Sequence, residues 1–220
     1  MVCVRNANGA LRICMDPKDL NENILREQYQ IPKREEILSE MAGAQWFTKL
    51  DASHGFWQLQ IDIASTDLCT FNTPFGRYSY QRLPIGISSA PEMFHCAMEN
   101  VFEGLEGVRV YIDDVIIWAE TPGQLNSRVH SALQRVHKYG LRLNKEKCQF
   151  STHEVTFLGD RLTPAGVQPD MNKIKAVMDV PQPTDKKAVQ RALGIRPARY
   201  EENLRCAIPL FNIAMRYDLR

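Results

Sequence analysis

The chain has 220 residues, of which 44% are hydrophobic and 24% charged, and its formal net charge is +1. These values are typical of a globular protein of one or two domains. No apolar run approaches the roughly 20 residues that span a bilayer, and the first residues lack the apolar core of a signal peptide. We therefore expect an intracellular protein without a membrane partner.

Charge and cysteine content narrow the function only slightly. A net charge near zero disfavours nucleic-acid binding weakly, because acids at the centre of a site and bases around its rim would cancel in the total. The six cysteines include no C-x-x-C pair. Free thiols are therefore expected, not a zinc site or a disulfide framework.

Alternating apolar residues separated by turn residues predict a series of short strands. The first two strands, within residues 2–14, flank a hairpin turn at Asn8-Gly9. Residues 16–21 are predicted to form a turn. Further strands or extended segments are expected at 46–51, 56–61, 68–71, 78–82, 108–112, 115–118, 141–143, 148–150, 155–158 and 161–163.

Apolar residues at helical spacing predict helices at 33–41, from Ser89 onwards, and at 122–139, 171–178 and 185–193. The helix that begins at Ser89 has Pro91 in its first turn. Its apolar stripe is expected to consist of Met93, Phe94, Ala97, Met98 and Val101. Because hairpins dominate the order, the expected fold class is α+β, with an antiparallel sheet and helices packed on one face.

Three acids lie at the ends of predicted strands. Asp51 ends the strand 46–51, and Asp113 and Asp114 form the predicted tip of the hairpin 108–118. Adjacent carboxylates ionise together at low cost only when a cation lies between them. Mg²⁺ prefers carboxylate oxygens and substrate phosphates, and two such ions can support phosphoryl transfer. The pattern indicates a candidate two-metal site, with solvated turn acids as the plain alternative.

Several segments resemble the motifs of one family, in the family's order. Tyr111-Ile112-Asp113-Asp114 resembles the signature hairpin of reverse transcriptases. Residues 50–58 resemble the first catalytic block of gypsy-class LTR retrotransposons. The other matching segments are 11–14, 16–21, 71–78, 83–91, 143–148 and 157–159. The resemblance covers about residues 2–195 and is to the reverse transcriptase domain of retroviral-type pol polyproteins.

The resemblance implies a right-hand polymerase with palm, fingers and a partial thumb. It implies RNA-directed DNA polymerase activity on an RNA or DNA template with a primer and deoxynucleoside triphosphates, in a cytoplasmic particle or the nucleus. Asp51, Asp113 and Asp114 would be the catalytic residues and would bind two Mg²⁺ ions, with Mn²⁺ as a substitute. The connection and ribonuclease H domains of the parent polyprotein are expected to be missing.

The implied domain boundaries follow the motif blocks. They are 1–45 for partial fingers, 46–85 for palm with a returning fingers segment, 86–140 for palm with the catalytic hairpin, 141–195 for the palm end and partial thumb, and 196–220 for a divergent tail.

Five residues are implied to contact the incoming nucleotide. Phe56 would be the aromatic gate that excludes a 2′-hydroxyl, or else a core residue. Arg12 would grip the triphosphate, for which a guanidinium is suited, and Arg5 would be a second cationic contact or an idle exposed residue. Tyr111 would lie by the primer terminus. Ile85 replaces the Phe usual in this subfamily and the Gln of retroviral relatives, which alters the pocket without removing a catalytic group.

A second set of residues is implied to contact primer and template. Phe157, Leu158 and Gly159 resemble the loop that holds the primer 3′ end, although Phe157 and Leu158 could equally be core. The thumb-side cations that would meet phosphates, or would form a solvated face, are Arg142, Lys145, Lys147, Lys173 and Lys175.

Departures from the family pattern leave two alternatives open. Residues 195–202 do not resemble the family's aromatic-rich helical segment, and Pro197 would break a helix. One alternative is therefore a catalytically inactive nucleic-acid-binding relic or a host-domesticated fragment. The other, a phosphotransferase or nuclease using the same acids, is disfavoured by the ordered motif blocks.

Overall fold

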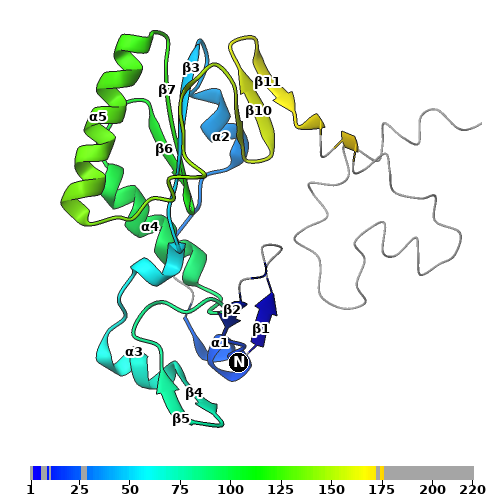
Figure 1. The fold of residues 1–220 in the computed structure, drawn as a ribbon, viewed down its shortest axis with the longest axis vertical. Coiled ribbons are helices and arrows are strands. Elements are labelled where there is room, and N and C mark those ends of the chain that lie inside the picture. Colours follow the sequence, from blue (N-terminus) through cyan, green and yellow to red (C-terminus); the bar gives the residue numbers. More distant parts are fainter. Residues whose placement is uncertain (1, 6–8, 10, 26–28, 172–173, 176–220) are drawn as a thin grey trace, which may run out of the picture. The chain divides into compact units, whose positions relative to one another are not determined.

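The computed structural model describes residues 2–5, 9, 11–25, 29–171 and 174–175 (Figure 1). The chain divides into two units, Met1–Pro169 and Asp170–Arg220. The helix predicted at 185–193 lies outside the described residues, as does most of the helix predicted at 171–178.

The first unit contains all the named elements. Its strands are β1 (Val2–Arg5), β2 (Leu11–Cys14), β3 (Trp46–Asp51), β4 (Thr70–Thr73), β5 (Gly76–Ser79), β6 (Val108–Tyr111), β7 (Asp114–Ala119), β8 (Gln149–Thr152), β9 (Val155–Phe157), β10 (Asp160–Thr163) and β11 (Gly166–Pro169). Its helices are α1 (Lys18–Asn23), α2 (Arg34–Ser39), the 3-10 helix η1 (Gly55–Gln58), α3 (Ile63–Leu68), α4 (Ala90–Phe102) and α5 (Pro122–Tyr139). Within the described part of the chain, no helix is long and apolar enough to cross a bilayer.

A four-stranded antiparallel sheet in the order β6-β7-β3-β8 carries the candidate site (Figure 1). Strand β3 pairs with β7 over its whole length, and the register places Asp51 opposite Asp114. Successive side chains of a strand point to opposite faces. The sheet therefore has a face that includes Leu50 and an opposite face that includes Asp51.

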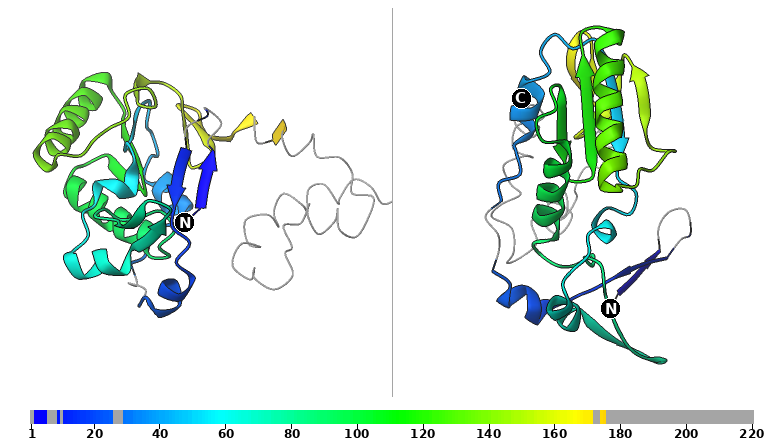
Figure 2. Two further views of the ribbon diagram at one scale, coloured as in Figure 1. Left: turned by 60° about the horizontal axis from the view of Figure 1, so that its bottom comes forward. Right: turned by 90° about the vertical axis from the view of Figure 1, so that its left-hand side faces the viewer.

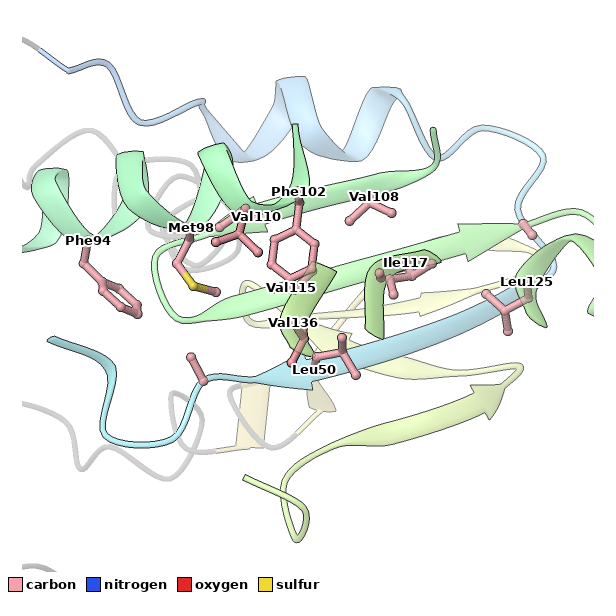
Figure 3. Packing of buried hydrophobic residues seen from close by; sticks show 14 residues of the cluster. Leu50, Phe94, Met98, Phe102, Val108, Val110, Val115, Ile117, Leu125 and Val136 are labelled. Atoms are coloured by element: carbon pink, nitrogen blue, oxygen red, sulfur yellow. The ribbon is translucent and has the colours of Figure 1, made fainter. Parts of the chain in front are cut away.

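Helices α4 and α5 cover the Leu50 face. Figure 3 shows Phe94, Met98 and Phe102 of α4 directed at the strands, and all three are buried in one cluster with Leu50. The cluster also contains Val108, Val110, Val115, Ile117, Leu125, Ala132 and Val136. Figure 2 (right) looks onto α5, with the strands behind it. This apolar layer holds in place the sheet that carries the acids at the end of its central strands.

Helix α5 begins and ends where the sequence predicts. The Thr121 hydroxyl accepts a hydrogen bond from the Gln124 backbone N–H at 3.3 Å, and Pro122 occupies the first turn. Gly140 ends the helix with a left-handed φ of 66°. The predicted stripe of α4 is less accurate, because Met93 is 37% exposed while His95 is completely buried.

The opposite face of the sheet is partly covered by α2, β9 and β10. Ile37 of α2 and Phe157 of β9 are buried in one cluster with Phe47, Ile116 and Trp118. The predicted α+β class with an antiparallel sheet is confirmed. The expectation that the helices pack on one face is wrong for α2. This helix packs on the Asp51 face, because the apolar side chains of Ile116 and Trp118 on that face form a cluster with Ile37.

The N-terminal hairpin is joined to the loop that contains Ile85. Strands β1 and β2 form the predicted antiparallel pair. The Met15 N–H donates to the Ile85 carbonyl at 2.8 Å. The Asn21 amide donates to the Gly86 carbonyl at 2.9 Å and accepts from the Ser88 N–H at 2.8 Å. The predicted turn at 16–21 is partly wrong, because α1 begins at Lys18.

Four further points of the sequence prediction need correction. Residues 56–61 were expected to be extended, but residues 55–58 form η1, which follows His54 at φ 55°. Helix α3 was missed; the Asp62 side chain caps it by accepting from the Ser65 N–H at 2.9 Å. Residues 141–143 form only an isolated bridge between Leu143 and Ala52. Strand β11 was not predicted either, because its four residues are all exposed and show no apolar alternation.

Candidate active site

The three predicted acids converge at one end of the central sheet. Asp51 is the last residue of β3, and it faces Asp114, the first residue of β7, as a directly opposed pair. Side chains paired in this way lie about 5 Å apart at their Cβ atoms. The Ala52 N–H donates to the Asp113 carbonyl at 2.9 Å, which brings Asp113 to the same place.

The tip of the β6–β7 hairpin differs from the sequence prediction by one residue. Tyr111 pairs with Asp114, so the two-residue turn is Ile112-Asp113 and Asp114 belongs to the strand. Ile112 has φ 56°, a conformation that β-branched residues adopt only as outliers. Such strain costs about 1–3 kcal/mol and persists only where the surroundings impose it. Asp113 is exposed, whereas Asp51 is only 7% exposed.

Two lysines neutralise the paired carboxylates. Lys49 Nζ lies 3.0 Å from an Asp114 oxygen, and Lys147 Nζ lies 3.4 Å from an Asp51 oxygen. Burial raises the pKa of Asp114, Lys49 opposes this shift, and the charges of Asp113 and Asp51 add to it. Within the described residues, no three acids, histidines or cysteines are gathered closely enough to hold a metal ion as they stand.

Backbone contacts from residues 142–148 support the Asp51 end of β3. The Asn144 N–H donates to the Asp51 carbonyl at 2.9 Å. The Gln58 side chain accepts from the Arg142 N–H at 2.7 Å and donates to the carbonyls of Arg142, at 3.0 Å, and Ser53, at 2.6 Å. The sequence analysis missed Gln58, because a glutamine within the block 50–58 carries no signal of its own for this clamp.

Three of the five predicted nucleotide contacts lie outside the N-terminal hairpin. Phe56 lies one residue after Gly55, whose Cβ would be 3.9 Å from the Asp113 Cβ, and its ring packs edge-on against Phe94 at 5.6 Å. Ile85 is half-buried in the loop joined to β2. Tyr111 is half-buried on the Asp51 face.

The two predicted arginine contacts lie on the N-terminal hairpin. Arg5, on β1, is exposed. Arg12 pairs with Val4 in the β1–β2 ladder, and its side chain lies outside the described part of the chain. Their contact with a triphosphate stays a prediction.

The predicted primer-contacting segment forms the turn between β9 and β10. Phe157 is completely buried, in agreement with its core alternative. Leu158 (φ 52°) and Gly159 (φ 80°) form the turn. The first residue of β10, Asp160, is 6% exposed and pairs with Arg34 of α2, which anchors the turn to the rest of the unit.

Among those predicted thumb-side cations that the structure describes, only Lys147 touches an acid of the site. Arg142 and Lys145 are exposed. Lys175 is exposed in the second unit, and Lys173 lies outside the described residues.

One further side chain contacts the strained turn and was not singled out from the sequence. His95 of α4, completely buried, accepts a hydrogen bond at Nδ1 from the Ile112 N–H at 3.1 Å. A histidine within an apolar helix stripe gives no signal for such a contact, because only the fold brings α4 to the hairpin.

An antiparallel sheet with α4 and α5 on one face and three acids where β3 meets the β6–β7 hairpin defines the palm of a right-hand polymerase. The reverse transcriptase (RNA-dependent DNA polymerase) family matches residues 4–162, which is most of the chain. The chain therefore belongs to the reverse transcriptase family, as its resemblance to that family predicted.

Two relatives illustrate the match in sequence. The retrovirus-related Pol polyprotein from transposon 297 of Drosophila melanogaster is 34% identical over 194 residues, which are 86% of this chain and 18% of that protein. The enzymatic polyprotein of cauliflower mosaic virus (strain NY8153) is 29% identical over 192 residues, 86% of this chain and 28% of that protein. The chain thus spans less than a third of the length of these curated relatives.

The solved structures that match confirm the fold. The foamy viral protease-reverse transcriptase in complex with double-stranded DNA superposes with a TM-score of 0.82 at 21% identity, covering 98% of this chain and 39% of that one. The same viral protein in complex with an RNA/DNA hybrid gives a TM-score of 0.79 at 21% identity, covering 99% of this chain and 30% of that one. The palm and fingers fold expected from the sequence is therefore established.

Proposed function

We propose that this chain is the RNA-directed DNA polymerase core of a retroelement, with Asp51, Asp113 and Asp114 as its catalytic, metal-binding carboxylates. The observation that carries the proposal is that these acids meet where strand β3 ends and the β6–β7 hairpin turns. Asp51 faces Asp114, and the carbonyl of Asp113, in the turn, accepts a hydrogen bond from the Ala52 N–H at 2.9 Å.

The chemistry of the three carboxylates suits divalent metal ions, and binding would draw the side chains closer together than they lie in the described structure. Hard cations such as Mg²⁺ take carboxylate oxygens, and lysine ammonium groups already lie beside Asp51 and Asp114. The three acids would hold two Mg²⁺ ions, for which Mn²⁺ would substitute. Such ions lower the pKa of a bound hydroxyl and stabilise charge on phosphate oxygens.

The side chains around the acids would orient the substrates. Asp113 is the exposed member of the set and is open to a primer and a deoxynucleoside triphosphate. Phe56 would exclude ribonucleotides by clashing with a 2′-hydroxyl. Arg12 and Arg5 would hold the triphosphate, because a guanidinium makes paired hydrogen bonds to phosphate oxygens.

The remaining contacts would fall to the pocket wall and the primer. Ile85 and Tyr111 would border the nucleotide. Leu158 and Gly159 would support the primer 3′ end, with Phe157 shaping their turn from the core. Lys145 and Lys147 would meet phosphates of an RNA or DNA template with its primer. The solved foamy viral relatives bind double-stranded DNA and an RNA/DNA hybrid, which supports this class of partner.

Primer extension on a poly-rA/oligo-dT template with Mg²⁺ tests the proposal. We expect extension by the wild-type chain and a loss of at least about 100-fold in Asp113→Asn, the order of magnitude lost when electrostatic stabilisation is removed. Asp67→Asn makes the same chemical change at an exposed position of α3 and should extend like the wild type. Equal extension by wild type and Asp113→Asn would overturn the assignment of the acids, and extension by neither would favour the inactive-relic alternative.

A further inference from the structure

The turn that presents Asp113 needs an external support. Ile112, its first residue, lies at φ 56°. An L-residue with a branched Cβ meets its own carbonyl group in this region. The conformation therefore has to be imposed by contacts outside the hairpin.

The contact that meets this need comes from α4. Nδ1 of His95 accepts a hydrogen bond from the Ile112 N–H at 3.1 Å. The His95 side chain is completely buried. A neutral imidazole carries one proton, so acceptance at Nδ1 requires the proton on Nε2. Burial lowers the pKa of His95, with Glu99 opposing the shift, which agrees with a neutral ring.

The ring of His95 also lies beside a carboxylate and two aromatic rings, but its Nε2 makes no hydrogen bond to the described residues. Nε2 of His95 lies 3.5 Å from a carboxylate oxygen of Glu99, one helical turn further along α4. The other oxygen of Glu99 accepts from the Tyr29 hydroxyl, and this contact raises the pKa of Tyr29 to about 12. The His95 ring also packs edge-on against Tyr29 at 5.8 Å and Tyr111 at 6.5 Å.

We propose that His95, packed against the rings of Tyr29 and Tyr111, is a positioning residue that holds the Ile112 peptide in its left-handed conformation and thereby aims the Asp113 carboxylate. The proposal rests on the function proposed above, in which Asp113 binds metal. Without an acceptor at this point, the partly buried Ile112 N–H would lose its hydrogen-bond partner. The turn would then relax toward an unstrained conformation and move Asp113.

Two substitutions separate hydrogen bonding from packing. In His95→Asn, the amide oxygen occupies the position of Nδ1 and can accept from Ile112; in His95→Leu, a methyl group occupies it and cannot. Met98→Ala on the same helix is the matched control for packing, because Met98 is 1% exposed in the core cluster against which Ile112 also packs, and the substitution removes packing without removing an acceptor.

Hydrogen exchange of the Ile112 amide, followed by NMR on chain labelled with ¹⁵N-isoleucine, measures the contact without catalysis. We expect exchange at least about tenfold faster in His95→Leu, as for one lost hydrogen bond, and near wild-type in His95→Asn and Met98→Ala. The amide of Ile117, in the middle of β7, should stay protected in all variants. Unchanged protection of Ile112 in His95→Leu would overturn the proposal.

Mn²⁺ titration, followed by paramagnetic broadening of the same signals, measures the Mn²⁺ affinity of the site, which depends on the position of the Asp113 carboxylate. We expect the apparent affinity for Mn²⁺ to fall at least about fivefold in His95→Leu and to recover in His95→Asn. Loss of Ile112 protection with unchanged Mn²⁺ affinity would overturn the positioning role. If Asp113→Asn itself leaves Mn²⁺ binding unchanged, the proposed metal site fails, while the exchange data still decide whether His95 holds the turn.

Discussion

At the residue scale, Asp114 is held in an environment that opposes its own negative charge. Asp114 sits where burial raises its pKa, and Lys49 counters that effect from 3.0 Å. Metal binding requires deprotonated carboxylates. An unpaired negative charge on Asp114 is therefore unfavourable, and a bound cation would stabilise it.

The pH dependence of metal binding follows from this arrangement. Because the pKa of Asp114 is raised above its usual value of about 3.9, Mn²⁺ affinity should begin to fall, as the pH is lowered, before an ordinary aspartate would protonate. Lys49→Met removes the group that lowers this pKa, so the fall should begin at a still higher pH. Mn²⁺ titrations between about pH 7 and 4 measure this shift; identical profiles for the two proteins would contradict it.

Phe56 is expected to select the sugar. Replacing it by Val removes the ring, so the preference in kcat/KM for deoxynucleotides over ribonucleotides should drop about 10- to 100-fold, or about 1.4–2.8 kcal/mol. The comparison is primer extension with dTTP against UTP. Phe75→Val, at an 89% exposed ring in the β4–β5 turn, makes the same change away from the acids and should keep the preference.

At the element scale, the strands and helices with strong periodicity or caps were predictable. Strand β3 and helix α5 have the predicted bounds, because one alternates apolar residues and the other has a Thr-Pro start and a Gly end. Helix α1 was not predictable, since it has six residues, no side-chain cap and no buried residue. Its Asn21 side chain instead makes a hydrogen bond to the Gly86 carbonyl, 65 residues away, a contact that the local sequence does not report.

The sheet register was harder to predict than the strands themselves. The acids were expected to form the hairpin tip, because propensity places polar residues in turns. Instead, the tip contains Ile112 at a strained φ, and Asp114 joins β7 opposite Asp51. The buried histidine of α4 that accepts from Ile112 lies 17 residues earlier in the chain. Local sequence patterns cannot report a conformation that a distant contact imposes.

The loop that contains Ile85 depends on a glycine. A Cβ at Gly86 would lie 2.0 Å from the Met15 carbonyl oxygen, and Gly86 has φ 120°. Gly86→Ala should therefore separate this loop from β2 and lower the free energy of unfolding by about 1–3 kcal/mol more than the control Gly76→Ala. Gly76 has a comparable φ of 129° but open space around it. Urea denaturation compares the two, and equal midpoints would show that the close approach to Met15 does not matter.

At the scale of the whole molecule, the net charge of +1 does not reveal where the charged side chains lie. Asp51 and Asp114 lie on the sheet face opposite α4 and α5, and Lys145 and Lys147 lie on the segment that bonds to the Asp51 backbone. The sequence suggested that central acids and peripheral bases would cancel. The fold places Lys147 beside Asp51, so the nearest base contributes to the site itself.

Binding to a primer–template should depend on which lysine is removed, and not only on the total charge. A lysine that contacts a phosphate adds about 0.7–0.9 to the slope of log K against log salt concentration. Lys145→Gln should therefore reduce the slope by about that amount, because Lys145 is exposed beside the Asp51-bonded residue Asn144. Lys138→Gln removes the same charge from α5, which covers the other face of the sheet, and should leave the slope unchanged. Fluorescence anisotropy of a labelled RNA/DNA hybrid at several salt concentrations measures both slopes; equal reductions would mean that the hybrid is attracted by total charge and not bound along the face that carries the acids.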